Sequence, residues 1–145
     1  MAIQYRKLSA EDRDQWQELY DSYLEFYETT FTQAAKDLVW ERLISGAIQG
    51  LAAEADGQLV GIAHFHYQTS TWTEVSNCYL EDLFVDPAHR GRGIARALIT
   101  TIEKAAKSAG CSEMYWITRA TNTTAQALYD QVATKTDFLR YEIKL

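Results

Sequence analysis

The chain has 145 residues, of which 47% are hydrophobic and 23% charged, a composition that suits one folded domain and excludes a disordered chain. No apolar run approaches the length of about 20 residues that spans a membrane, and the N-terminal stretch "MAIQYRKLSAED" lacks the apolar core of a signal peptide. The formal net charge of −6 argues against general nucleic-acid binding, because neutralising phosphates requires an excess of Lys and Arg.

The charges and the cysteines narrow the class of protein further. Residues 11–30 hold seven acidic side chains and one basic one, whereas residues 90–107 hold five basic side chains and one acidic one. The acidic stretch could face a cation and the basic stretch an anion, or both could be solvated helix faces. Cys78 and Cys111 form no CxxC or Cys/His cluster, so we expect no metal site and no disulfide framework. A reducing cytoplasm is the expected location.

In chain order, the apolar pattern first predicts a strand at residues 3–8. A helix then begins at a capping box, Ser9-x-x-Asp12. A second helix is expected over residues 34–44 and ends near Gly46. The first helix presents one apolar face, made by Trp16, Leu19, Tyr20, Tyr23 and Tyr27.

After the second helix, the spacing of the apolar residues changes from that of a helix to that of strands. Asp56-Gly57 lies between two apolar runs and predicts a hairpin. The elements expected after it are a strand at 77–85, a helix at 93–109 closed by Gly110, a buried strand at 113–118, a helix at 123–132 and a last strand at 137–145. This order predicts an α/β protein, with a mixed sheet covered by helices on both faces and one domain over residues 1–145.

The most informative segment is "YLEDLFVDPAHRGRGIARALI", residues 79–99, in which a strand passes Pro87 into a glycine-rich turn and a helix. A helix that follows such a turn presents unpaired backbone N–H groups and the positive end of its dipole, which suits a phosphate. The P-loop pattern G-x-x-x-x-G-K-[ST] is absent, and the dinucleotide pattern G-x-G-x-x-G fails after Gly93. The segment is therefore another kind of phosphate-binding turn, or a helix start that merely needs glycine.

What remains is R-x-x-G-x-A, made by Arg90, Gly93 and Ala95. Preceded by "LFVDP", it resembles the acetyl-CoA-binding motif of the GCN5-related N-acetyltransferase (GNAT) superfamily. The resemblance implies a GNAT-type, mostly antiparallel mixed sheet, acetyl-CoA as cosubstrate and no metal. It assigns CoA binding to the turn and to the strand end before it, namely Leu83, Phe84, Val85, Arg90, Gly91, Arg92, Gly93, Ile94, Ala95 and Arg96.

A second stretch, "NTTAQALYD", places Asn122 seven residues before Tyr129, so two helical turns bring both to nearly the same face. This resembles the C-terminal GNAT motif, in which the asparagine contacts the pantetheine arm and the tyrosine lies near the thioester sulfur. The alternative is that Tyr129 is one more half-buried aromatic residue. The chain departs from the family after Tyr129, since the usual Y-x-x-x-G-F is stretched to "YDQVATKTDF", with Asp137 where glycine is expected.

Amine acetylation requires a neutral amine, a polarised thioester carbonyl and a proton for the departing thiolate. The resemblance gives Glu81 the role of base or substrate anchor and Asp82 a secondary place in amine binding. Strand alternation puts these two on opposite faces, and either could instead be a structural carboxylate. A backbone N–H between Leu83 and Val85 would polarise the carbonyl, and Tyr129 would protonate the sulfur.

The stretch "WTEVSNCYLEDLFV" followed by "HRGRGIA" looks most like the spermidine/spermine N-acetyltransferase branch. We therefore predict direct transfer, in a ternary complex, to a primary amine of a small cationic substrate, with polyamines or diamines favoured. Tyr27 is a candidate substrate residue because aromatic rings attract ammonium groups, Phe26 is the alternative match, and Tyr20 and Tyr23 are expected in the core.

Other functions remain open at this point. An amino acid, a protein lysine or a protein N-terminus are alternative acceptors, and a non-catalytic acyl-CoA-binding module is an alternative of a different class. The resemblance also implies a homodimer. Nucleic acid and membranes are not expected as partners.

Overall fold

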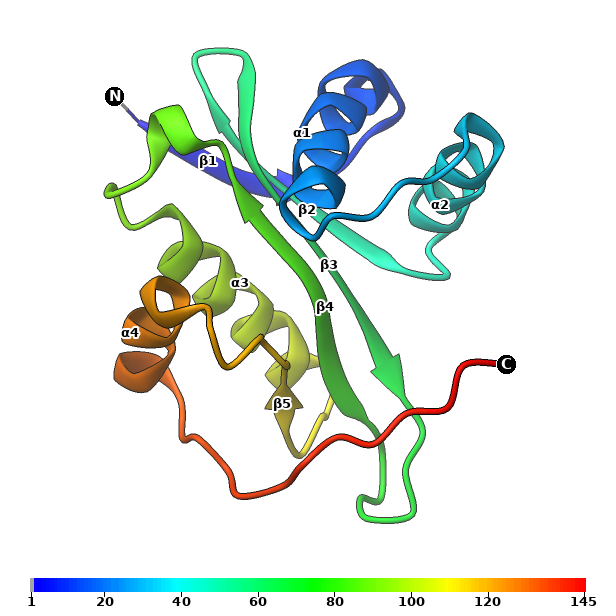
Figure 1. Cartoon of the computed structure of the whole chain (residues 1–145), viewed down its shortest axis with the longest axis vertical. Helices are drawn as coiled ribbons and strands as arrows, with labels where there is room; N and C mark the ends of the chain where they lie inside the picture. The colour runs from blue at the N-terminus through cyan, green and yellow to red at the C-terminus, as the bar shows by residue number, and fades with distance from the viewer. Residues whose placement is uncertain (1) are drawn as a thin grey trace.

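A computed structural model describes residues 2–145 (Figure 1). Five strands form one sheet in chain order, in which the first four pair antiparallel and the fifth pairs parallel to the fourth. The mixed α/β architecture predicted from the sequence is confirmed. The elements are β1 (Ile3–Lys7), α1 (Arg13–Phe26), α2 (Gln33–Ser45), β2 (Gln49–Ala55), β3 (Gln58–Gln68), β4 (Asn77–Val85), α3 (Ile94–Ser108), β5 (Met114–Tyr115) and α4 (Thr123–Val132).

Helices cover both faces of the sheet, α1 and α2 on one side and α3 with α4 on the other (Figure 1). On the first side, Trp16 of α1 is fully buried and packs with Ile62 and Phe84 of the sheet. On the second side, the apolar stripe of α3 packs against alternate residues of the same strands, such as Ala63. Burial of these two apolar surfaces is the main favourable term in folding.

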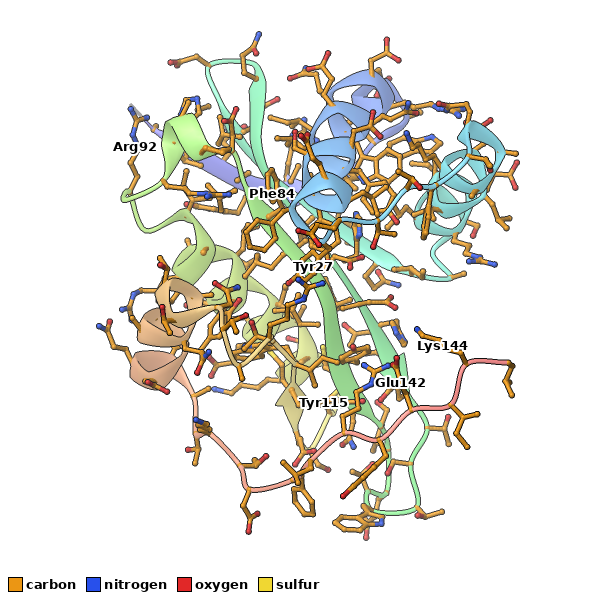
Figure 2. All side chains as sticks on the ribbon, viewed as in Figure 1. Tyr27, Phe84, Arg92, Tyr115, Glu142 and Lys144 are labelled. Atoms are coloured by element: carbon orange, nitrogen blue, oxygen red, sulfur yellow. The ribbon has the colours of Figure 1, made fainter. Side chains whose placement is uncertain are left out.

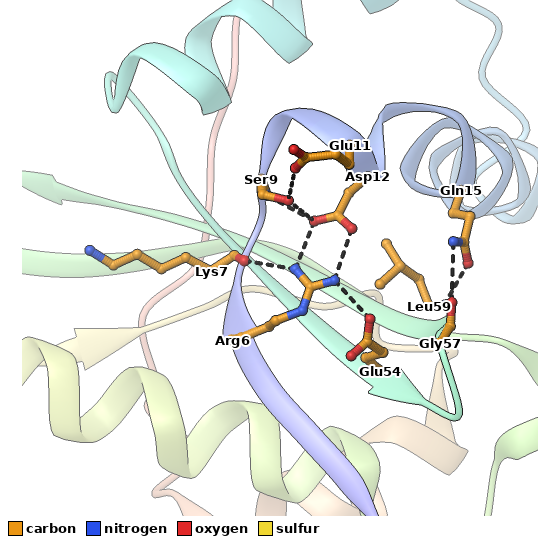
Figure 3. A network of polar contacts seen from close by, with 9 residues as sticks. All are labelled: Arg6, Lys7, Ser9, Glu11, Asp12, Gln15, Glu54, Gly57 and Leu59. Atoms are coloured by element: carbon orange, nitrogen blue, oxygen red, sulfur yellow. Dashed lines mark hydrogen bonds and ion pairs between the residues drawn. The ribbon is translucent and has the colours of Figure 1, made fainter.

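Arg6 on β1 ties the sheet to the start of α1 (Figure 3). Its guanidinium donates to both carboxylate oxygens of Asp12, over 2.8 and 2.9 Å, and to Glu54 on β2 over 3.0 Å. Asp12 also accepts the backbone N–H of Ser9 over 2.7 Å, so the predicted capping box is present. The hydrogen bonds from Arg6 hold the pKa of Asp12 below its ordinary value, against the opposing effect of burial.

The predicted hairpin joins β2 to β3. Asp56 and Gly57 both have positive φ, at 50° and 79°, which is the conformation of the two-residue turn that matches strand twist.

The two strands predicted last differ from the structure. β5 spans only Met114–Tyr115 instead of residues 113–118, and Ile117 is 48% exposed rather than buried. Residues 133–145 form no helix or strand, so the strand predicted at 137–145 is wrong. A strand needs a neighbouring edge for its backbone hydrogen bonds, and a two-residue β5 offers almost none.

Candidate active site

β4 carries a β-bulge at the two acidic residues singled out in the sequence. In the β3–β4 ladder His64 pairs with Asp82 and Phe65 pairs with Leu80, so Glu81 is the extra residue. Glu81 and Asp82 consequently line the same cavity, although strand alternation predicted opposite faces. That part of the prediction is wrong, because alternation holds only along an unbroken ladder.

Asp82 lies at the centre of a chain of hydrogen bonds. The Tyr23 hydroxyl donates to its Oδ1 over 2.6 Å, and Nδ1 of His64 lies 2.8 Å from its Oδ2. Nε2 of His64, whose ring is buried, accepts the indole N–H of Trp16 over 2.9 Å. Because an indole N–H can only donate, the proton of the His64 ring is on Nδ1 and points at Asp82. Two donors therefore orient the Asp82 carboxylate.

Three tyrosines beside these carboxylates keep their phenol protons. Burial, with a smaller effect of Asp82, raises the pKa of Tyr20 to about 12 and holds that of Tyr23 well above its ordinary value. Burial also raises the pKa of Tyr27. Tyr20 packs in the core as predicted, but Tyr23 hydrogen-bonds Asp82 and so is more than a core residue. Tyr27 lines the cavity, whereas Phe26 is 52% exposed and does not.

Tyr27 lines this cavity and is also a neighbour of Tyr129 on α4. It lies near the centre of the molecule, where α1 ends close to β4 (Figure 2). The Arg119 guanidinium lies 5.2 Å from the centre of the Tyr27 ring and donates to the Tyr27 carbonyl over 3.5 Å. Burial raises the pKa of Tyr129, and the neighbouring Tyr27 adds to that rise. Tyr129 packs edge-on against Trp116, with ring centres 5.3 Å apart.

β4 and β5 separate soon after they meet. Within residues 2–145, the parallel ladder joins only residues 78–79 to residues 114–115. At the far end of β4, the N–H of Asp86 donates to a carbonyl of β3 over 2.9 Å. Because backbone groups alternate sides along a strand, the N–H groups of Leu83 and Val85 point away from β3, toward the gap. Beyond residue 79, β4 is therefore splayed apart from β5.

The turn from β4 to α3 presents several backbone N–H groups at its surface. Gly91 and Gly93 have left-handed φ angles of 79° and 76°, and Gly93 is the N-cap of α3. Among the described residues no side chain caps this helix, so the N–H groups of its first turn have no helical partner and favour an anion. A Cβ at either glycine would meet nothing within 4 Å, so the backbone conformation, and not lack of space, requires glycine.

The three arginines of the turn are placed differently. Arg90 donates to a carbonyl at the end of β4 over 3.0 Å, and its guanidinium lies 5.5 Å from the centre of the Phe84 ring. Arg90 thus braces the strand end. Arg92 lies at the outer edge of the turn (Figure 2), and Arg96 donates to Gln131 on α4.

Asn122 is the N-cap of α4 and begins the helix that carries Tyr129. Its side-chain oxygen accepts the N–H of Ala125 over 3.4 Å, and its amide nitrogen lies 3.4 Å from the Thr118 hydroxyl. The helix predicted over residues 123–132 is confirmed, so Asn122 and Tyr129 are separated by two helical turns as expected.

The cavity on the α1 and α2 side of the sheet has a volume of about 440 Å³. Its walls are mostly aromatic and aliphatic, with acids from β4 and one arginine from α2. A larger hollow of about 660 Å³ lies beside the β3–β4 loop and contains none of the predicted site residues. The smaller cavity is lined by Tyr20, Tyr23, Leu24, Tyr27, Thr29, Phe31, Val39, Arg42, Leu43, Ile48, His64, Glu81 and Asp82.

Several residues of this site were missed in the sequence. The sequence pattern assigns Trp16 only to a core face and gives no role to His64, Arg42 or Arg119. One signal pointed to His64, since it interrupts the long apolar run of β3 and a buried polar ring needs partners. Nothing local identifies its partner, because Trp16 lies 48 residues away.

Comparison with known proteins identifies the family. Residues 16–133 match the acetyltransferase (GNAT) family. The chain belongs to this family. It is 28% identical over 144 residues to the D-amino-acid N-acetyltransferase HPA3 of Saccharomyces cerevisiae, covering 97% of this chain and 89% of that protein. It is 41% identical over 61 residues to the thialysine N-epsilon-acetyltransferase of Mus musculus, covering 41% of this chain and 35% of that protein. The thialysine enzymes support the predicted likeness to the polyamine-acetyltransferase-like branch.

Solved structures agree with this assignment. A ribosomal-protein-alanine N-acetyltransferase from Brucella melitensis biovar Abortus 2308 superposes with a TM-score of 0.81 at 27% identity, covering 99% of this chain and 100% of that one. The aminoglycoside acetyltransferase AAC(6')-Iy, in complex with a CoA bisubstrate analogue, superposes with a TM-score of 0.88 at 21% identity, covering 100% and 99%. The second similarity shows the fold alone. The GNAT-type fold and the N-acetyltransferase class predicted from the sequence are confirmed.

GNAT acetyltransferases use acetyl-CoA, so the glycine turn and the strand gap are where this cosubstrate is to be sought. In the part of the chain that the structure describes, no three His, Cys, Asp or Glu side chains form a metal-binding group. Among residues 2–145, no helix combines the length and the apolar character needed to cross a membrane.

Proposed function

We propose that this GNAT acetyltransferase moves the acetyl group of acetyl-CoA directly onto a primary amine of a small cationic molecule, with residues 1–145 acting as one domain. The observation that carries the proposal is the pair of carboxylates, Glu81 and Asp82, in one aromatic-walled cavity. Two negative charges and several tyrosine rings favour an ammonium group. These acids lie on the strand whose far end enters the glycine turn.

Acetyl-CoA supplies an activated acetyl thioester. The turn fits its pyrophosphate, because the left-handed glycines and the uncapped start of α3 leave backbone N–H groups available to an anion. Arg92 and Arg96 add positive charge there. The gap beside β4 fits an extended pantetheine arm, with the backbone at residues 83–85 and Asn122 as its neighbours, and a free N–H on this strand would polarise the thioester carbonyl.

In the proposed reaction Glu81 takes a proton from the substrate ammonium, so that the nitrogen lone pair attacks the thioester carbon. Asp82 accepts hydrogen bonds from Tyr23 and His64. In the proposed reaction it therefore contributes a fixed negative charge and does not act as the base. Tyr129 gives its phenol proton to the departing sulfur. The raised pKa of Tyr129 keeps that proton in place through the physiological range.

The cysteines support direct transfer. Cys78 is fully buried, and burial raises the pKa of its thiol to about 11, so little of the nucleophilic thiolate is present. Both Cys78 and Cys111 are free thiols, which supports the proposed cytoplasmic location.

Two classes of small acceptor suit these features. Polyamines and diamines match the two carboxylates, whereas the names of the D-amino-acid and thialysine acetyltransferases favour an amino acid. Peptide lysines and N-termini are the further acceptors to test. A non-catalytic acyl-CoA-binding module would need neither Glu81 nor Tyr129.

The test is a thiol-release assay with acetyl-CoA against polyamines, diamines, amino acids and a basic peptide. Saturable turnover is expected for wild type, and Glu81→Gln should lower kcat by about 100-fold or more while CoA affinity is retained. Glu103→Gln, at an exposed acid on α3, is the matched control and should change neither. CoA binding without turnover on any amine would favour the binding module and overturn the proposed catalysis.

We also propose a homodimer that forms through residues 133–145. Five large apolar side chains of this segment are at least 77% exposed, namely Phe138, Leu139, Tyr141, Ile143 and Leu145. The segment extends from α4 past β5 and, in the view of Figure 1, across the lower ends of β3 and β4. An alternating segment that pairs with no strand among residues 2–145 suits a strand edge of a second copy.

A further inference from the structure

The cavity that contains Glu81 and Asp82 also contains one cation. Arg42 lies in the last turn of α2 and is the third charged side chain of the lining, beside the neutral His64. No ion pair joins Arg42 to either acid within the described residues, so its charge stands apart from theirs. The cavity therefore offers an acidic side, on β4, and a basic side, on α2.

Arg42 differs from two other charged residues of its helix, Lys36 and Asp37, which are paired. Lys36 pairs with Asp21 over 2.7 Å, and Asp37 pairs with Arg13. In the described part of the chain the Arg42 guanidinium makes neither a hydrogen bond nor an ion pair, whereas its backbone carbonyl accepts from Ser45 and Ile48. A guanidinium at the edge of a cavity with unused donors is available to a ligand anion.

We propose that the acceptor is an amino acid whose carboxylate binds Arg42 while its reacting ammonium group lies at Glu81 and Asp82. This inference rests on the proposed acetyl transfer. A guanidinium matches a carboxylate with two parallel hydrogen bonds, which makes Arg42 a residue that selects the substrate without touching the reacting atoms. A polyamine or diamine carries cations at both ends and would place one of them near Arg42, where like charges repel.

The rest of the lining indicates which amino acids fit. Between the charged groups the walls are aromatic and aliphatic, including Phe31, Val39 and Ile48. They suit an apolar side chain or a run of methylene groups. The volume of about 440 Å³ lies near the lower end of the range of about 300–1,000 Å³ that small-molecule sites occupy.

The chemistry balances as before, because the carboxylate takes no part in it. A proton passes from the ammonium to Glu81, the new N–C bond forms, the C–S bond breaks and the Tyr129 proton goes to sulfur. The second proton that the nitrogen loses restores the Tyr129 phenol through solvent. Arg42 affects only which amine binds in the cavity. Its removal should therefore act on KM for the acceptor and leave the rate at saturation nearly unchanged.

The experiment compares acceptors that differ only in the carboxylate: lysine with cadaverine, and phenylalanine, in both D and L forms, with phenethylamine. Wild type should prefer the carboxylated member of each pair. Arg42→Gln should raise KM for the amino acids by about 10- to 100-fold and leave that for phenethylamine unchanged. It should lower KM for cadaverine, because the repulsion of the second ammonium group is removed. Arg42→Glu should invert the preference toward cadaverine. Glu41→Gln, at the exposed neighbour on α2 outside the cavity, is the control and should change neither.

Calorimetric binding of the same acceptor pairs, without acetyl-CoA, separates the two proposals. If no acceptor is acetylated but lysine or phenylalanine binds and loses affinity in Arg42→Gln, acetyl transfer fails and the role of Arg42 stands. Equal KM values for each pair in wild type, or amino-acid kinetics and binding that Arg42→Gln leaves unchanged, would overturn the carboxylate proposal.

Discussion

The indole N–H of Trp16 donates to Nε2 of His64 across 2.9 Å, and this contact orders the acidic side of the cavity. It leaves the second ring nitrogen of His64 as a donor to Asp82, whose other oxygen accepts from Tyr23. A core residue of α1 thereby sets the hydrogen bonding of a carboxylate in the candidate active site.

Replacing Trp16 with Phe should remove the donor to Nε2 of His64, while Asp82, which can only accept, still holds a proton on Nδ1. Two-bond 15N–1H NMR spectra should show the Nδ1–H form of His64 in wild type, and the Nε2 resonance should shift in Trp16→Phe because that nitrogen loses its hydrogen bond. The free energy of unfolding should fall by about 1–3 kcal/mol, because Nε2 is left buried without a donor. The control is Trp40→Phe, which should leave the His64 tautomer and its Nε2 resonance unchanged. The ring centre of Trp40 lies 5.0 Å from that of Trp16 in the same core. An Nε2–H form in wild type would contradict the assignment.

Tyr129→Phe should lower kcat by about 100- to 10,000-fold, because it removes the proposed proton donor to sulfur. KM for acetyl-CoA should change little. Burial raises the pKa of Tyr129 above its ordinary value of 10, so the protonated acid persists up to that pH and kcat should decline only above it. Tyr115→Phe, whose hydroxyl bonds Gln68 outside the cavity, should behave like wild type. A pH–rate profile that Tyr129→Phe leaves unchanged would remove the residue from the mechanism.

Gly93→Ala should raise KM for acetyl-CoA. The left-handed conformation costs alanine about 1–2 kcal/mol, so the turn shifts and its N–H groups lose their arrangement. Gly46→Ala is a matched control, because Gly46 has a φ of 82° and equally open surroundings at the end of α2. Steady-state kinetics and denaturant unfolding should show a similar loss of stability in both variants and a KM change in Gly93→Ala alone. Equal KM changes would argue against a role of the turn in CoA binding.

Asp12→Asn should lower the free energy of unfolding at neutral pH by about 1–3 kcal/mol, since the charged hydrogen bonds to Arg6 are weakened. The pKa of Asp12 is lowered in the folded state, so its contribution is present above the ordinary value of 3.8 and is lost as pH falls through the folded value. Denaturant unfolding of both proteins from pH 7 to acid should show the difference shrinking below that range. Asp14→Asn, in the first turn of α1 and exposed, should show no such trend.

Removal of residues 134–145 should convert the proposed dimer into a monomer. Sedimentation velocity on the full chain and the truncated chain measures this directly. Ile143→Asp should have the same effect, because it places a charge among the exposed apolar side chains, whereas Lys144→Gln should not. A monomeric full chain would refute the proposed dimer.

Most of the elements could be predicted because their signals are local. The capping box at Ser9, the Asp56-Gly57 turn and the glycines before α3 each depend on the backbone angles of a few consecutive residues. The glycine turn, together with the spacing of Asn122 and Tyr129, was enough to indicate the family. Strand alternation failed in β4, because a bulge is set by pairing and leaves no mark in the pattern.

The sequence by itself determined the α/β class, the glycine turn before α3 and the acetyltransferase family, since each follows from residue types at short spacing. Only the tertiary structure decided that Glu81 and Asp82 share a cavity, that Trp16 orients His64, and that Arg42 lines the same cavity from α2. It also left residues 133–145 without a strand partner. The physical reason is the same in each case: register and packing join residues that are distant in the chain, and side-chain contacts across a sheet have no period of their own.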